Sequence, residues 1–141
     1  MNSQVSAIAY DPVQSLLAVG TNETQFGQGQ IYVYGKRRIS VTFNFQRNTS
    51  AKFLAFCGTK LVCVDSKHDI NVFSLETNSL LVSYASPNFV TAFATDPSIE
   101  YAFIGLQNGA WYCLCSSDND GLIIDTKLLS LRRCGGLRPG P

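Results

Sequence analysis

The chain has 141 residues, of which 45% are hydrophobic and 15% are charged, and its formal net charge is +1. This composition excludes a disordered chain, which lacks apolar residues, and a strongly basic nucleic-acid-binding protein. No stretch reaches the ~18 consecutive apolar residues of a membrane-spanning helix, and Met1–Tyr10 lacks the basic start and apolar run of a secretory signal. We therefore expect a cytoplasmic protein that makes at most peripheral membrane contact.

The N-terminal part of the chain contains four short runs rich in β-branched and aromatic residues, each bounded by Gly, Pro, Asn or Asp. These runs are Val5–Tyr10, Leu16–Thr21, Gln30–Tyr34 and Ile39–Phe45. The first run stops at Asp11 and Pro12, because an Asp side chain caps turns and a Pro fixes φ and ends strand pairing. The pattern predicts four antiparallel strands and no helix.

The same pattern of four runs occurs twice more along the chain. The second set is Lys52–Cys57, Lys60–Asp65, Ile70–Leu75 and Leu80–Tyr84, and the third set is Val90–Thr95, Tyr101–Leu106, Ala110–Cys115 and a weaker Leu122–Lys127. The octets at Val5–Pro12 and Val90–Pro97 share five residues, and the equivalent octet at Ala51–Gly58 falls between them. These spacings are close to the ~40–45 residues of a four-stranded propeller blade. The repeats predict an all-β fold, an incomplete WD-like β-propeller with about three four-stranded antiparallel blades.

We expect the blades to occupy residues 1–118, with repeats at about 5–45, 51–86 and 90–127. Three blades cannot close a ring, since known propellers have roughly four to eight. The chain is therefore expected to be a piece of a longer product, and pairing with further blades in trans is the alternative. Residues 128–141 are rich in Gly and Pro, and we expect them to form a disordered tail without strand or helix.

Few side chains are candidates for catalysis or metal binding. His68 is the only histidine, and it falls in a predicted turn, Ser66–Asp69, where a solvated polar residue is a simpler interpretation than a Ser-His-Asp device. Cys113 and Cys115 have one residue between them, whereas a zinc knuckle has roughly two to four. A propeller hydrolase would need clustered acids or histidines, which the sequence lacks. We expect no catalytic, cofactor-binding or metal-binding residue, and hence a protein that is not an enzyme.

The basic cluster Lys36, Arg37 and Arg38 lies at a predicted hairpin between the third and fourth strands. It is a weak candidate for contact with a protein partner or anionic lipid, because each basic residue contributes only about 1 kcal/mol near such a membrane. A solvated outer hairpin is the alternative. The residues with an expected structural role in turns are Asp11, Pro12, Asp96, Pro97, Asn108 and Gly109.

Several stretches resemble a known family more narrowly than a generic WD pattern does. They are Asp11–Thr21 with Gln30–Gly35, Leu61–Thr77, and Thr95–Gly109. The last reads TDPSIEYAFIGLQNG and is the most specific, because an Asp-Pro turn and a strand are followed by Ile-Gly-Leu-Gln-Asn-Gly. Together they resemble the fungal branch of the lethal giant larvae/tomosyn family over about Val5–Gly109.

The resemblance implies a tandem pair of β-propellers in the complete protein. It also implies binding to SNAREs of the syntaxin and SNAP-25 type, contact with a Rab GTPase and tethering machinery, and a role in polarised exocytosis. Because the family's partner surfaces span many blades, no individual binding residue is carried over to this chain. The alternative function is that of a generic WD-repeat adaptor in another multiprotein complex.

Overall fold

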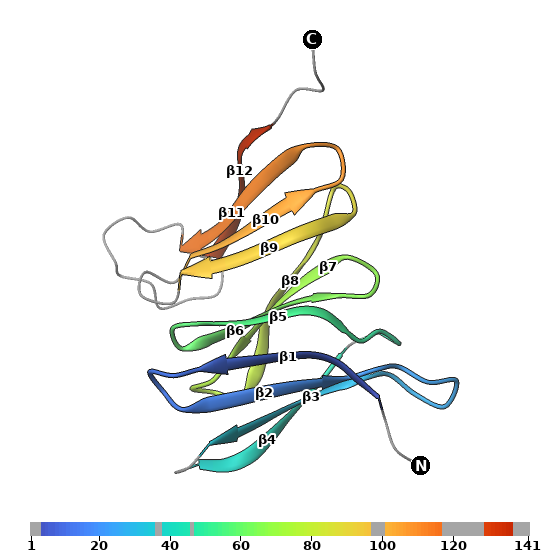
Figure 1. Ribbon diagram of the computed structural model, residues 1–141, viewed down its shortest axis with the longest axis vertical. Helices are drawn as coiled ribbons and strands as arrows, with labels where there is room; N and C mark the ends of the chain where they lie inside the picture. Colours follow the sequence, from blue (N-terminus) through green and yellow to red (C-terminus); the bar gives the residue numbers. More distant parts are fainter. Residues whose placement is uncertain (1–3, 36–37, 46, 97–100, 117–128, 137–141) are drawn as a thin grey trace.

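The computed structural model describes residues 4–35, 38–45, 47–96, 101–116 and 129–136 of the chain. These residues form twelve β-strands in three four-stranded antiparallel sheets, and the described ranges contain no helix. Figure 1 shows the three sheets stacked along the longest axis of the molecule, in chain order. The predicted fold class is therefore confirmed.

Each sheet is built from four consecutive strands in the order of the chain. The first sheet contains β1 (Val5–Asp11), β2 (Leu16–Thr21), β3 (Gln30–Gly35) and β4 (Arg38–Asn44). The second contains β5 (Ala51–Cys57), β6 (Lys60–Asp65), β7 (Asp69–Ser74) and β8 (Ser79–Ala85). The third contains β9 (Val90–Asp96), β10 (Tyr101–Leu106), β11 (Ala110–Ser116) and β12 (Leu129–Gly136). Strand β5 packs beside both β1 and β9, so the first strands of the sheets lie along a common edge.

The middle sheet is covered on both faces, and this explains why its strands have nearly continuous apolar runs. One core lies between the first two sheets, where the Phe73 ring is 4.7 Å from that of Phe43 and 6.4 Å from that of Phe45, measured between centroids. The other core lies between the second and third sheets, where the rings of Phe53 and Phe93 stack with centroids 6.0 Å apart. Strands β6 and β7 are buried at every position after the first. A strand covered on both faces needs no alternation of polar and apolar residues.

The fourth strand of the third sheet differs from the sequence prediction. Strand β12 pairs with β11 from Ser116↔Leu129 to Ala110↔Gly136, so it lies inside the 128–141 segment that was expected to be a disordered tail. The predicted strand at Leu122–Lys127 lies outside the described residues. Pairing along the whole of β11 outweighs the low strand propensity of Gly135 and Gly136, which stand at the end of the ladder.

Candidate partner-binding face

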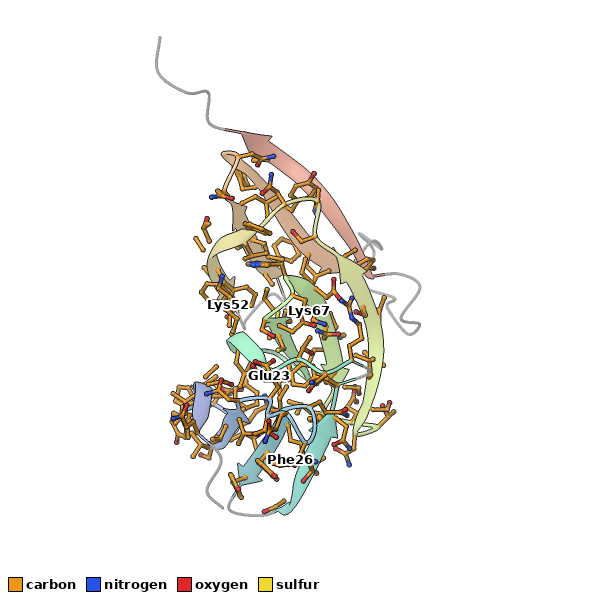
Figure 2. All side chains as sticks on the ribbon, turned by 90° about the vertical axis from the view of Figure 1, so that its right-hand side faces the viewer. Glu23, Phe26, Lys52 and Lys67 are labelled. Carbon is orange, nitrogen blue, oxygen red and sulfur yellow. The ribbon has the colours of Figure 1, made fainter. Side chains whose placement is uncertain are left out.

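One side of the stack collects the loops that connect the second and third strands of each sheet. These are the β2–β3 loop (22–29), the β6–β7 turn (66–68) and the β10–β11 turn (107–109), together with the β8–β9 connection (86–89). We call this side the loop face. It is the right-hand side of Figure 1, and Figure 2 looks onto it with Glu23, Phe26, Lys52 and Lys67 labelled. Loops that a rigid scaffold holds in place carry binding and catalytic residues more often than other segments do.

The first two sheets are joined at the loop face by hydrogen bonds between their loops. Ser66 Oγ donates to Glu23 Oε2 at 2.9 Å, and the Ser50 amide donates to Ser66 Oγ at 3.3 Å. The Gly29 amide donates to the Thr49 carbonyl at 2.8 Å. A Cβ at Gly29 would lie 2.1 Å from the Thr21 carbonyl oxygen, so only glycine allows this close approach. The β2–β3 loop is thereby fixed against the second sheet.

A polar hollow opens on the loop face between β1 and β5. Its volume is about 390 Å³. The residues that line this inter-blade hollow are Ser6, Asn22, Glu23, Ser50, Ala51, Lys52 and Ser66. The hydroxyl oxygen of Ser6 is buried and has no hydrogen-bond partner among the described residues. The lining residues thus carry a carboxylate, an ammonium group, an amide and hydroxyl groups.

His68 connects the second and third sheets at the same face. Its φ of 66° places it in the left-handed region, and its Nδ1 accepts a hydrogen bond of 2.9 Å from the Val90 amide. The imidazole also stacks on Phe89, with ring centroids 4.7 Å apart. Burial, together with the nearby Lys52 ammonium, lowers the pKa of His68. From the sequence, His68 was interpreted as a solvated turn residue. That interpretation missed its contacts with Val90 and Phe89, because the local sequence around His68 does not indicate them.

The geometry of His68 predicts a loss of stability in mild acid. A protonated imidazole cannot accept a hydrogen bond from the Val90 amide, and the folded-state pKa of His68 is below the ordinary value of a histidine. The stabilising contribution is therefore complete above the unfolded-state pKa and is lost as the pH falls through the lowered folded-state pKa. In the full-length protein, we expect the thermal unfolding midpoint to fall between neutral pH and about pH 5.5.

The His68→Asn variant is the matched control, because Asn tolerates positive φ and does not titrate in this range. The fall in its unfolding midpoint over the same pH interval should be smaller than in the wild type. Equal falls in both proteins would show that His68 does not cause the pH dependence.

Two phenylalanines at the loop face are exposed to solvent. The side chain of Phe26 is 79% exposed in the β2–β3 loop, and that of Phe89 is 58% exposed in the β8–β9 connection. A bridge between Thr24 and Gly27 closes the loop around Phe26. Exposed aromatic residues on a fixed loop are typical of the anchors of protein interfaces. The sequence analysis did not select Phe26, although a single aromatic residue in an otherwise polar loop can indicate a binding site.

Arg38, the described residue of the predicted basic cluster, does not belong to the loop face. Arg38 is the first residue of β4 and pairs with Gly35, at the opposite end of the first sheet from the β2–β3 loop. Lys36 and Arg37 lie outside the described residues.

The predicted turn residues are spread over both sides of the stack. Asp11 Oδ1 accepts the Val13 amide at 2.9 Å on the side opposite the loop face. Asn108 Oδ1 accepts the Ala110 amide at 3.1 Å, and Gly109 has a φ of 89°, in a turn of the loop face. Asp96 is the last residue of β9. Pro12 follows Asp11 and is exposed, while Pro97 lies outside the described residues.

Asp65 is a buried carboxylate that the sequence analysis did not single out. It accepts the backbone amides of Lys67 at 2.9 Å and Asp69 at 3.0 Å, and the side-chain amide of Asn71 at 3.1 Å. These bonds fix the conformation of the β6–β7 turn, and both carboxylate oxygens of Asp65 accept at least one of them. Asp65 is therefore a structural residue of the loop face.

The described residues contain no group of three or more His, Cys, Asp and Glu side chains that could hold a metal ion. In the same ranges, no helix has the length and apolar character needed to cross a membrane.

Comparisons with known proteins agree with this architecture. No protein-family model matches the chain. The chain is 35% identical over 111 residues to Lethal(2) giant larvae protein homolog SRO77 of Saccharomyces cerevisiae, a match that covers 78% of this chain and 10% of the relative. It is 28% identical over 104 residues to an uncharacterised protein of Schizosaccharomyces pombe, covering 71% of this chain and 10% of that protein. The chain thus spans about a tenth of the length of both relatives.

Two solved structures show the same fold at low sequence identity. The crystal structure of Sqt1 from Saccharomyces cerevisiae matches 96% of this chain and 36% of its own, with a TM-score of 0.66 and 17% identity. The β-propeller domain of Cps50 (Swd1) from Myceliophteria thermophila matches 90% of this chain and 56% of its own, with a TM-score of 0.55 and 8% identity. The three sheets are therefore propeller blades, and the chain belongs to the lethal giant larvae family.

Proposed function

We propose that this chain is part of a non-catalytic β-propeller scaffold that acts in SNARE-dependent polarised exocytosis. The observation that carries the proposal is its 35% identity to the yeast lethal giant larvae homologue. The proposed partners are SNAREs of the syntaxin and SNAP-25 type, with a Rab GTPase and tethering machinery as further contacts. The proposed location is the cytoplasm, with peripheral association at the plasma membrane.

The loop face supports the proposal as a surface for protein contact. Phe26 and Phe89 give it exposed aromatic groups, and Glu23, Lys52 and Lys67 give it charges of both signs. Interfaces combine aromatic anchors with a polar rim in this way. Lys36, Arg37 and Arg38 remain proposed contacts for anionic lipid or a second partner, because Arg38 stands at the other end of the first sheet.

A pulldown with the full-length protein from a lysate of its own organism tests the proposed function. The proposal predicts that a syntaxin- or SNAP-25-type SNARE is retained. Retention of another multiprotein complex with no such SNARE would contradict the proposal and would favour the generic WD-repeat adaptor.

Replacing Phe26 with alanine is expected to weaken partner binding while leaving the fold intact. The side chain is 79% exposed, so its removal should change stability by no more than about 0.5 kcal/mol. An aromatic anchor at an interface contributes about 2 kcal/mol or more, so the dissociation constant should rise roughly thirtyfold.

Titration calorimetry of the full-length variant with the retained partner measures this effect. Val13→Ala is the matched control, because Val13 is 86% exposed in the β1–β2 turn on the side opposite the loop face. Equal affinities for the wild type and the Phe26→Ala variant would place the interface elsewhere.

A further inference from the structure

We propose that the inter-blade hollow binds an extended peptide segment of a partner protein, and that Glu23 is the counter-charge for a lysine or arginine side chain of that segment. This inference rests on the proposed scaffold function and adds the chemistry of the segment that the scaffold recognises.

The position and lining of the hollow suit a peptide. It opens on the loop face, between the β2–β3 loop and the first strand of the second sheet, with Glu23 and Lys52 at its border (Figure 2). Hydroxyl and amide groups both donate and accept hydrogen bonds, as the backbone of an extended peptide requires.

The contacts of the two charged residues favour a basic ligand over an acidic one. The Lys52 ammonium keeps its charge, but it is held toward the third sheet, where it donates to the Val90 carbonyl of β9 at 3.2 Å and lies 5.6 Å from the centroid of the Phe53 ring. Within the described ranges, the Glu23 carboxylate has one hydrogen-bond partner, the neutral Ser66 hydroxyl at 2.9 Å. A carboxylate accepts several hydrogen bonds and binds charged donors more strongly than neutral ones. Most of the hydrogen-bond acceptor capacity of the Glu23 carboxylate is therefore available to a cation.

The other acidic groups of the second sheet near the loop face are already occupied. Asp69 forms an ion pair of 2.7 Å with Arg47, the one ion pair found within the described ranges. Asp65 accepts three hydrogen bonds from its own turn and from Asn71. Among the described residues of this face, Glu23 is thus the carboxylate that can select a basic side chain.

Phe26 offers the proposed peptide an apolar contact beside the charged contact at Glu23. It follows Glu23 by three positions in the same fixed loop, and its ring is 79% exposed. A segment with a basic side chain at Glu23 can place a neighbouring apolar side chain on Phe26. The recognised segment therefore combines one basic and one apolar residue.

A peptide library tests the inference without knowledge of the natural partner. Fluorescently labelled full-length protein is applied to immobilised short peptides of randomised sequence, in which one position is fixed as Lys, Arg, Gln or Glu. Retention on the Lys and Arg sets should exceed retention on the Gln set about fivefold, as expected for a partly buried ion pair. In the Glu23→Gln variant this ratio should fall to near one.

Two further variants separate a counter-charge from a structural role. Glu76→Gln removes an exposed acid from the β7–β8 turn on the opposite side and should keep the preference for basic peptides. Glu23→Lys should move the preference to the Glu set. Circular dichroism confirms that each variant is folded.

The inference is wrong if the wild type shows no preference for basic peptides or if Glu23→Gln retains the preference. It is also wrong if Glu23→Lys keeps the preference for the Lys and Arg sets, since the charge at position 23 would then not select the peptide. No SNARE is present in this assay, so a failure of the proposed function appears in the pulldown and not here.

Discussion

Replacing Phe73 with alanine is expected to lower the free energy of unfolding by about 3–5 kcal/mol, the usual cost of deleting a buried phenylalanine side chain. Phe73 is 1% exposed, and it packs against Phe43 and Phe45 of the neighbouring blade. Its removal leaves a cavity in the interface that joins the first two sheets. Thermal unfolding of the full-length protein measures the effect as a fall in the transition midpoint.

Phe26→Ala is the matched control for this experiment, because the same side chain is deleted at a position that is 79% exposed. The control should unfold close to the wild-type temperature. Similar midpoints for Phe73→Ala and Phe26→Ala would contradict the packing of the second blade against the first.

The second large effect concerns the 141-residue chain studied alone, which we expect to associate in solution. The outward face of the first sheet carries Ile8 at 63% exposure and Tyr10 at 61%. The equivalent residues of the second sheet are Leu54 at 8% and Phe56 at 4%, which are covered by the first sheet. No described residue covers this face of the first sheet, and exposed apolar faces of this kind promote association.

The third sheet presents an open face at the other end of the stack. A hollow of about 390 Å³ lies over β9, β10 and β11, and it is lined by Ala92, Phe93, Ala94, Phe103, Ile104, Gly105 and Trp111. Stacked repeats gain stability from each interface, so two uncovered faces also weaken the cooperativity of unfolding.

Light scattering and thermal scanning of the purified chain measure these properties. We expect oligomers, low solubility and a broad transition. Replacing Ile8 and Tyr10 with lysine should reduce the association, whereas Val13→Lys in the adjoining turn should not. A monomer with a sharp, reversible transition would contradict the expectation that the exposed faces of the first and third sheets cause association.

The strands could be predicted from the sequence because their signals are local. The bounds of β2, β6 and β10 are the predicted ones, since each strand is an apolar run that ends at a turn residue. Strand β12 could not be predicted, because it depends on the unpaired edge of β11 more than on its own residues. Pairing between distant segments overrides local propensity at such positions.

The candidate face was less predictable than the fold, because it depends on contacts between blades. Glu23 and Ser66 are 43 positions apart, and His68 and Val90 are 22 apart. No local pattern indicates that these residues meet. The sequence analysis instead selected the basic cluster of Lys36, Arg37 and Arg38, of which Arg38 begins β4 at the opposite end of the first sheet from the β2–β3 loop.

Hydrogen exchange of the full-length protein, with and without the SNARE retained in the pulldown, tests the central claim most directly. If this chain belongs to a scaffold that binds its partner through the loop face, exchange should slow in residues 22–29 and 66–68 when the partner is bound. Exchange in the turns at 11–15 and 75–78, on the opposite side, should stay the same. Protection confined to those opposite turns, or unchanged exchange at the loop face in the bound protein, would contradict the claim.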